Sequence, residues 1–348
     1  MLLKRLSLHL KKQLTMQHTR LFFSLMACTL MVVACTSCGP ESPPPPPPPS
    51  TPTPPIIPVF NADSAYNDIA SQVAFGPRVL GSEGHAECKD WLVETLKATG
   101  ARVLQQEFTA EVYTGEKFRA TNIMAQFNPD VSDRILLCAH WDTRHIADSP
   151  LSEERQEEPI LGADDGGSGV GVLLEIARQL QENPVGIGID IVLFDAEDYG
   201  ESGGEPESYC LGSQYWSRNP ITPYKARYGI LLDMVGAKEA QFLIEGWSWH
   251  YAQSTVEKVW GMAARMGRSN YFINRGTQGG ITDDHYFVNL LAGIPTIDII
   301  NLNGTTQTSF GAHWHTHNDD MDIIDKNTLR AVGQVLLAVI YNEDAGLL

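Results

Sequence analysis

Residues 187–198 read IGIDIVLFDAED, an apolar run that is followed at once by the acidic residues Glu197 and Asp198. A short, continuous apolar run of this kind is typical of a strand that is covered on both faces of a sheet. Adjacent residues on the irregular segment after a strand point apart, so one acid can bind a metal while the other faces a substrate. Solvated loop acids are the alternative, which the strongly apolar strand disfavours.

Two more strands of this type are predicted, over residues 134–140 and 228–234. His140 and Asp142 lie at and just after the end of the first strand, and Asp233 lies at the end of the second. In open α/β sheets, ligands bind at the carboxyl ends of the strands. The sequence therefore predicts a functional site at this edge, although His140 taken alone is better interpreted as a buried structural histidine.

Helices are predicted between these strands, from apolar periodicity and from terminal residues such as Gly100. Strands that alternate with helices indicate an α/β fold: a single globular domain with a mixed, mostly parallel central sheet flanked by helices on both faces. A fourth strand is expected at 295–300. The predicted helices cover residues 83–99, 169–181, 249–266 and, after a cap at Asp325, the segment up to about Tyr341.

Residues 162–169 read GADDGGSG and open a predicted helix. The segment has no Gly-Lys-Ser/Thr, so it is not a phosphate-binding loop. Two aspartates among glycines suit a tight turn that aims a carboxylate at a cation, with Asp165 as the candidate. Capping of the helix by Asp164 or Asp165 is the alternative.

The C-terminal part supplies the remaining candidates. Residues 283–285 read DDH in front of an apolar segment, and residues 310–316 read FGAHWHT. A hydrolase-type zinc site needs nitrogen and oxygen ligands, a free carboxylate as general base and an open coordination position. His315 and the scattered carboxylates match that inventory jointly, although no single segment is diagnostic.

Residues 1–35 have the composition of a secretory signal. A basic start precedes a short apolar run at 21–34, and the run ends in small residues and Cys35, like the lipobox of a bacterial lipoprotein. Translation could also start at Met16. We expect a protein of the bacterial cell envelope, anchored in a membrane by a lipid on Cys35 and facing the periplasm; an uncleaved N-terminal anchor is the alternative.

Residues 36–60 form a Pro-rich linker, with seven consecutive prolines from Pro43 to Pro49. Such a run is a stiff, extended spacer that would hold a catalytic domain, residues 61–348, away from the membrane. Without the five basic residues before Cys35, 20 basic residues face 42 acidic residues, a net charge of −22. This balance argues against nucleic acids and anionic lipid surfaces as partners.

Three cysteines fall in the expected domain: Cys88, Cys138 and Cys210. They are widely spaced, so they allow at most one disulfide and form no CxxC zinc motif. We expect structural roles for all three, and a buried position for Cys138 within its apolar strand.

Taken together, these residues resemble the zinc aminopeptidase superfamily and, within it, the animal-type glutaminyl cyclases. The resemblance covers residues 61–348. Features that point to the cyclases are Asp283 directly before Asp284-His285, Trp314 directly before His315, and apolar residues at Phe310 and Ile281. The motifs shared with the whole superfamily are residues 75–82 (FGPRVLGS), His140 with Asp142, Gly162-Ala163 with Asp165, Glu197-Asp198, residues 211–213 (LGS), residues 232–234 (LDM) and Asp284-His285.

The resemblance implies a role for each candidate residue. A single zinc ion would be bound by Asp165, Asp198 and His315. Glu197 would be the acid/base, in a hydrogen-bond network with Asp233 and Asp283. Trp314, Phe310 and Ile281 would line the pocket for a glutamine side chain, and the substrates would be peptides or proteins with N-terminal glutamine. A monomer is the state that the superfamily resemblance implies.

The chain departs from the animal cyclases at three places. Asp198 stands where the usual pair has a second glutamate, and it is shorter by one methylene. The animal disulfide would join Cys138 to position 170, which is Val170 here, so no such bridge is expected. The loop from Tyr199 to Tyr209 does not match the animal segment, and its role is not predicted.

A two-zinc aminopeptidase is the alternative function, because His140 and Asp233 could complete a second metal site. In that enzyme Glu197 would activate a water molecule instead of an amine. Asp283 favours the cyclase, since the peptidases have no need of its additional charge. A binding protein on an inactive hydrolase fold is a third hypothesis, which the complete set of ligand and base residues disfavours.

Overall fold

The computed structural model describes residues 54–221, 224–302 and 306–348. The predicted signal segment, residues 1–35, and most of the predicted linker lie outside these residues. No helix among the described residues is long and apolar enough to cross a membrane. The described residues lie in one compact unit.

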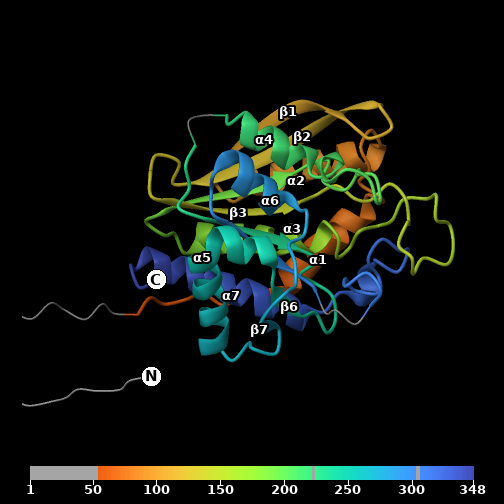
Figure 1. Cartoon of the computed structure of the whole chain (residues 1–348). Helices are drawn as coiled ribbons and strands as arrows, with labels where there is room; N and C mark the ends of the chain where they lie inside the picture. Colours follow the sequence, from red (N-terminus) through yellow and green to blue (C-terminus); the bar gives the residue numbers. More distant parts are fainter. Residues whose placement is uncertain (1–53, 222–223, 303–305) are drawn as a thin grey trace, which may run out of the picture. The chain divides into compact units, whose positions relative to one another are not determined.

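A six-stranded mixed sheet forms the centre of this unit (Figure 1). Its strand order is β1-β2-β4-β3-β5-β8. The pairs β4–β3, β3–β5 and β5–β8 are parallel, and β1–β2 and β2–β4 are antiparallel. The strands are β1 (Arg102–Glu111), β2 (Lys117–Phe127), β3 (Arg134–His140), β4 (Gly188–Phe194), β5 (Gly229–Asp233) and β8 (Thr296–Ile300). The predicted mixed, mostly parallel sheet is confirmed, and β3, β4, β5 and β8 are the four predicted strands.

Strands β1 and β2 were not predicted from the sequence. β1 forms the edge of the sheet: its first half is mostly exposed or partly exposed, and its second half alternates between buried and exposed residues. Its composition is therefore far from the apolar runs that identify the central strands. The two strands form an antiparallel hairpin whose turn ends at Lys117.

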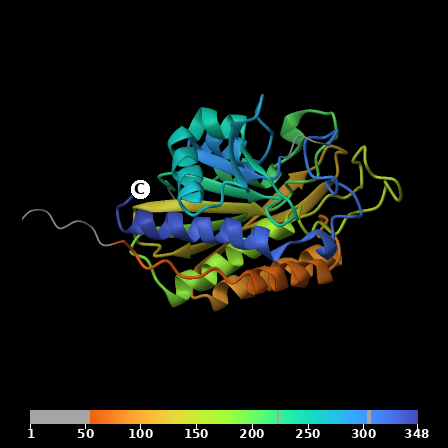
Figure 2. The same cartoon turned by 90° about the horizontal axis from the view of Figure 1, so that it is seen from below.

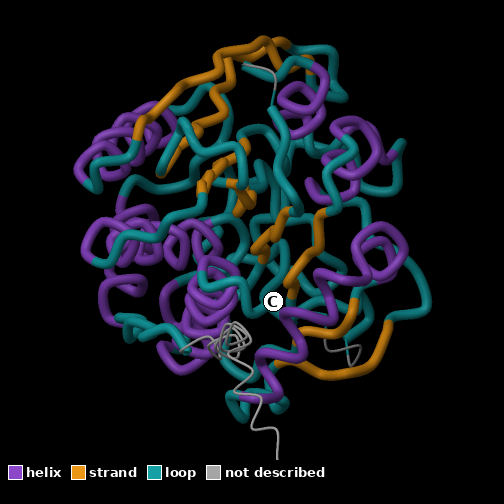
Figure 3. The backbone as a smooth tube through the Cα atoms, turned by 90° about the vertical axis from the view of Figure 1, so that its left-hand side faces the viewer, coloured by secondary structure: helices purple, strands orange, loops and turns teal. Residues whose placement is uncertain are grey.

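Helices cover both faces of the sheet, as predicted (Figure 3). Side chains of β3 alternate between the two layers: Ile135 and Leu137 enter the larger core, and Leu136 and Cys138 enter the smaller one. The larger core is covered by α1 (Ala62–Ala74), α2 (Glu83–Ala98), α3 (Gly167–Glu182), α5 (Gly246–Arg265) and α7 (Lys326–Asp344). The smaller core is covered by α4 (Leu211–Arg218), α6 (Asp284–Phe287) and the π-helical turn Val288–Ala292.

Helices α1, α3 and α7 pack side by side under the sheet (Figure 2). The short parallel strands β6 (Phe242–Ile244) and β7 (Phe272–Gly276) form a separate two-stranded sheet next to α5. Helices α2, α3, α5 and α7 agree with the prediction to within three residues at each end. The predicted cap of α7 is confirmed, since Asp325 accepts a hydrogen bond from the N–H of Asn327. Helices α1, α4 and α6 were not predicted.

The glycines of residues 162–169 allow α3 to approach the sheet closely. Gly166 has φ +87°, a conformation that favours glycine. A Cβ atom on Gly169 would lie 2.3 Å from the carbonyl oxygen of Leu232 in β5. The start of α3 is therefore pressed against the carboxyl end of β5, where Asp233 lies.

All three cysteines of the domain are buried and free. This confirms the buried position expected for Cys138. It also agrees with the expectation that no bridge joins Cys138 to position 170.

Candidate active site

The candidate site lies at the carboxyl ends of the parallel strands. His140 ends β3, Asp233 ends β5, and Glu197 and Asp198 follow β4. Four of the eight non-glycine residues with positive φ among the described residues lie beside or within the site: Ala196, Cys210, Met234 and His315, with φ between +48° and +57°. Residues other than glycine rarely adopt this conformation, and such strain gathers at functional sites.

Asp165, Asp198 and His315 form a buried group that could hold a metal ion, with one ligand atom of each within 4.8 Å of the others. The Nε2 atom of His315 lies 3.3 Å from Asp198 Oδ1 and 3.7 Å from Asp165 Oδ2. Asp198 Oδ2 is buried and has no hydrogen-bond partner among the described residues. One imidazole and two carboxylates are a donor set that suits zinc, and an unpaired buried oxygen is what a ligand atom would leave.

The orientation of His315 is fixed by Asp148. Its Nδ1 atom lies 2.8 Å from Asp148 Oδ1, which leaves Nε2 directed at the two aspartates. Arg144, which is fully buried, holds both oxygens of Asp148 at 3.1 and 2.6 Å and donates to the backbone carbonyls of Asp198 and Gly200. This arrangement matches the carboxylate that supports a metal-bound histidine in many sites. Neither Asp148 nor Arg144 was predicted.

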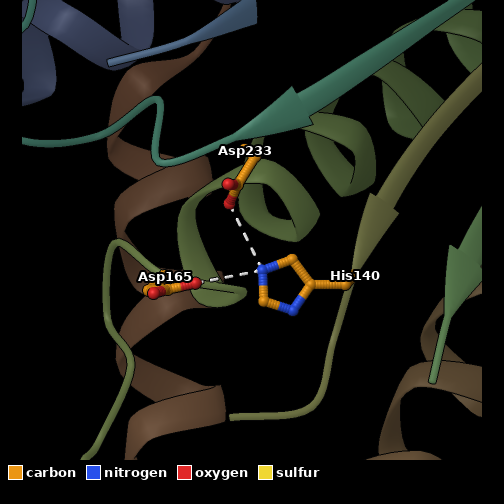
Figure 4. A group of neighbouring side chains, drawn as sticks. All are labelled: His140, Asp165 and Asp233. Atoms are coloured by element: carbon orange, nitrogen blue, oxygen red, sulfur yellow. Dashed lines mark hydrogen bonds and ion pairs between the residues drawn. The ribbon is translucent and has the colours of Figure 1, made fainter. Parts of the chain in front are cut away.

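A second group, His140, Asp165 and Asp233, shares Asp165 with the first (Figure 4). The Nε2 atom of His140 lies 3.1 Å from Asp165 Oδ1 and 3.2 Å from Asp233 Oδ1. Burial lowers the pKa of His140, but the hydrogen bonds and charges of these carboxylates and of Asp142 outweigh it and hold that pKa well above its usual value. A proton or a cation could therefore occupy the position between the two aspartates.

Asp319 holds the loop that carries Asp165. Its two carboxylate oxygens accept hydrogen bonds from the N–H groups of Asp164 and Asp165, at 2.7 and 3.0 Å. Asp164 turns away from the metal group, accepts hydrogen bonds from the N–H groups of residues 236 and 237, and contacts His313. Helix α3 has no side-chain cap, so the capping alternative for Asp164 and Asp165 is wrong.

Asp142 sets the orientation of the acidic pair, because its two oxygens accept the N–H groups of Glu197 and Asp198, each at 3.1 Å. Burial raises the pKa of the Glu197 carboxyl well above its usual value, and the neighbouring charges of Asp198 and Asp283 raise it further. A carboxyl with a raised pKa exchanges its proton at a higher pH than a free glutamate, which suits a general acid/base.

The two acids expected to form a network with Glu197 occupy different surroundings. Asp283 belongs to the same close group as Glu197, and its Oδ2 atom has no hydrogen-bond partner among the described residues. Asp233 instead binds His140. Burial and the charges of Asp165 and Asp283 raise the pKa of Asp233 well above its usual value. Behind Asp283 lies Asp298 on β8, a buried carboxylate that was not predicted.

A pocket of about 280 Å³ joins these groups, and all nine predicted site residues line it. Three apolar residues form walls of this pocket: the rings of Phe310 and Trp314 have centroids 4.8 Å apart, and Ile281 packs in the same cluster. Trp314 also stacks on His315, with ring centroids 3.8 Å apart. The full predicted set is Asp165, Glu197, Asp198, Asp233, Ile281, Asp283, Phe310, Trp314 and His315.

The loop from Tyr199 to Tyr209, whose role the sequence left open, forms part of the wall of this pocket. Glu201, Gly203, Gly204, Pro206 and Tyr209 line the cavity. The loop is exposed over most of its length, and Arg144 lies over the ring of Tyr209. It is therefore placed to contact whatever enters the pocket.

Comparison with known proteins identifies relatives of this chain. Residues 122–340 match the sequence profile of peptidase family M28. A crystal structure of Bacteroides thetaiotaomicron glutaminyl cyclase bound to N-acetylhistamine is 49% identical, with a TM-score of 0.80, and the match covers 82% of this chain and 99% of that one. A Zn-dependent exopeptidase from Parabacteroides distasonis is 51% identical, with a TM-score of 0.80, over 82% and 100% of the two chains.

A more distant relative is the glutaminyl-peptide cyclotransferase of Drosophila melanogaster. It is 23% identical over 274 residues, which cover 72% of this chain and 73% of that protein. Bacterial and animal cyclases are thus both among the proteins that resemble this chain over most of their length.

Proposed function

Since the chain belongs to peptidase family M28, we propose that its pocket performs the reaction of its cyclase relatives: cyclisation of an N-terminal glutamine to pyroglutamate, with release of ammonia. The activity is that of a glutaminyl-peptide cyclotransferase, and the substrates are peptides or proteins with N-terminal glutamine. The observation that carries this function is the pocket itself, in which Asp283 lies beside Glu197 below walls formed by Trp314, Phe310 and Ile281.

Zinc is the metal that this family and the donor set imply, and Asp165, Asp198 and His315 would hold a single ion. When bound there, zinc supplies a Lewis acid for the γ-carbonyl oxygen of the glutamine. In the alternative function, the two-zinc aminopeptidase, His140, Asp165 and Asp233 would hold the second ion.

Glu197 is the acid/base of the reaction. The α-amine attacks the γ-carbonyl carbon, the new C–N bond closes the ring, and the bond to the side-chain nitrogen breaks. Glu197 takes a proton from the amine and gives it to the departing ammonia, so the carboxylate is regenerated in each cycle. Its raised pKa suits it to both steps. Asp283 is placed to form a hydrogen bond with Glu197. Asp233 fixes the orientation of the His140 ring.

The apolar walls make the substrate fold back on itself. A glutamine side chain must bring its γ-carbonyl next to its own α-amine, and a confined pocket reduces the entropy lost in reaching that geometry. Trp314 and Phe310 provide flat surfaces for the side chain and exclude water that could hydrolyse the amide instead.

The location proposed for the protein rests on the sequence. A lipid on Cys35 would anchor it in the bacterial cell envelope, and the linker of residues 36–60 would place the catalytic unit in the periplasm. Its substrates would then be exported chains whose N-terminal glutamine is exposed by signal cleavage, and the enzyme would act as a monomer.

A mixed peptide pool tests the function. The purified protein is incubated with Gln-Xaa and Leu-Xaa peptides of equal length, and the products are measured by mass spectrometry. We expect loss of one ammonia from the glutamine peptides alone, stopped by a chelator and restored by zinc. Release of whole N-terminal residues would show instead the two-zinc aminopeptidase, and a metal content near two ions per chain would support that result.

A further inference from the structure

The thiol of Cys210 contacts the carboxyl group of Glu197. Sγ lies 3.2 Å from Glu197 Oε1, a distance within the range of a hydrogen bond in which the S–H group donates. Cys210 is fully buried and stands at the N-cap position of α4, but its side chain caps nothing there. The thiol therefore has the carboxyl group as its partner and no helix-capping role.

The main chain holds Cys210 in place against the same residue. Its N–H group donates to the carbonyl oxygen of Glu197 at 2.8 Å, and the N–H of Leu211 donates to the carbonyl of Ala196 at 2.9 Å. These two hydrogen bonds close the base of the loop 199–209. Cys210 adopts φ +56°, a conformation that is strained for a residue other than glycine.

The two oxygens of the Glu197 carboxyl group consequently differ. Oε1 accepts from the thiol, whereas Oε2 has no hydrogen bond to the described residues and lies 4.0 Å from His140 Nδ1. Glu197 lines the pocket, so Oε2 is the oxygen that remains free for a substrate.

We propose that Cys210 is a positioning residue for the cyclisation: its thiol holds Oε1 of Glu197 and leaves Oε2 as the atom that exchanges protons with the substrate. This inference rests on the proposed function. The S–H group fixes the rotation of the carboxyl group, so Oε2 faces the amine before attack and the ammonia after it. Burial raises the pKa of the Cys210 thiol well above its usual value, so it stays protonated and remains a donor.

Two substitutions separate the hydrogen bond from the packing of the side chain. Cys210→Ala removes the donor, and Cys210→Ser keeps one; both retain an L-residue at the strained backbone position. We expect the alanine variant to lose roughly tenfold in kcat for a Gln-Xaa peptide, the effect of one lost hydrogen bond to a charged group, with KM changed less than about twofold. The serine variant should recover most of that loss.

Cys88→Ala is the matched control, because it removes a buried thiol that has no contact with Glu197. Zinc content and the affinity for N-acetylhistamine should be the same in the wild type and in both Cys210 variants, and all three proteins should be folded at the assay temperature, which shows that the metal group and the pocket are intact.

Four outcomes are decisive. The inference alone is overturned if the wild type cyclises glutamine peptides and Cys210→Ala is equally fast, if Ala and Ser are equally slow, or if the loss appears in KM instead of kcat. If the wild type releases whole N-terminal residues, the proposed function is overturned, and the inference falls with it.

Discussion

Glu197 is the proposed acid/base, and substitution of this single residue tests the proposal. In Glu197→Gln the amide has the same shape but cannot accept a proton from the amine. We expect kcat to fall by roughly 10²- to 10⁴-fold, the usual contribution of a general acid/base. Zinc should stay bound, because Asp165, Asp198 and His315 are unchanged. The variant is assayed for ammonia release and for metal content; turnover close to that of the wild type would remove Glu197 from its role.

Asp148 orients His315 without facing the substrate, so its substitution should act on the metal. Asp148→Asn keeps the shape but removes the charge that faces His315 Nδ1 and Arg144. We expect zinc affinity, measured by competition with a chelator, to fall by roughly 10- to 100-fold. Asp130→Asn, at an exposed position, is the control. Equal affinities in the two variants would contradict the supporting role of Asp148.

At this scale the sequence predicts residues that come directly before or after recognisable strands, or that lie in compact motifs. Glu197, Asp233, Asp283 and His315 were all found in that way, and they meet in one pocket. Arg144, Asp148 and Asp298 were missed. Asp148 lies in an irregular loop and meets His315 across 167 positions of the chain, a contact that no local pattern encodes. Asp298 lies within the apolar strand β8, where its neighbours in sequence conceal it.

Helix α3 should be sensitive to side-chain volume where it touches β5. Gly169→Ala would place its Cβ atom 2.3 Å from the carbonyl oxygen of Leu232, so the helix must shift. We expect a loss of about 1–3 kcal/mol in the free energy of unfolding, as for other overpacked cores. Gly261→Ala in α5 is the matched control: its Cβ atom has no neighbour closer than 3.8 Å, so the better helix former should stabilise by about 0.5–1 kcal/mol. Urea unfolding measures the free energy of unfolding of both variants. Changes of the same sign in the two variants would contradict the close approach of α3 to β5.

The start of α5 should contribute less to the stability of the fold at acidic pH, because of Glu245. The carboxylate of Glu245 accepts hydrogen bonds from the N–H groups of Trp247, Ser248 and Ile281 and lies 2.9 Å from His285 Nε2. Burial raises its pKa, but His285 and the N–H groups outweigh burial and lower the pKa to about 2. Its folded pKa is depressed, so the stabilisation is complete above 4.5, the value without these partners, and is lost as the pH falls toward 2.

Glu245→Gln tests this element. At pH 7 the variant should be less stable than the wild type by up to about 3 kcal/mol, and the difference should shrink as the pH falls from 4.5 to 2.5. Urea unfolding at several pH values measures it, with Glu87→Gln, an exposed residue of α2, as the control. A difference that stays constant down to pH 2.5 would show that Glu245 is not held ionised in this way.

The central strands and long helices could be predicted because their apolar patterns are continuous and their ends are marked by caps or glycines. The hairpin β1–β2 could not be predicted in this way, because it forms the exposed edge of the sheet. Its pairing also depends on β4, which lies 60 residues later in the chain. Short helices such as α4 and α6 consist of one or two turns, and contacts with the sheet stabilise them more than their own sequence does.

For the whole molecule, the sequence predicts a catalytic unit tethered to a membrane by Cys35. Cys35→Ala should move the protein from the membrane fraction to the soluble fraction and abolish incorporation of labelled palmitate. Cys38→Ala should change neither. A Cys35→Ala protein that stays in the membrane fraction would indicate the alternative, an uncleaved N-terminal anchor.

The site residues with a left-handed backbone conformation create a conflict between the stability of the protein and its activity. Ala196, Cys210, Met234 and His315 each hold a conformation in which glycine would be more relaxed, and each flanks a group that must be aimed accurately. A change such as Ala196→Gly would therefore reduce the backbone strain, but it would also make the positions of Glu197 and Asp198 less well defined. Directed evolution for heat resistance alone would tend to select such changes. The resulting variants would be more stable to heat and less active.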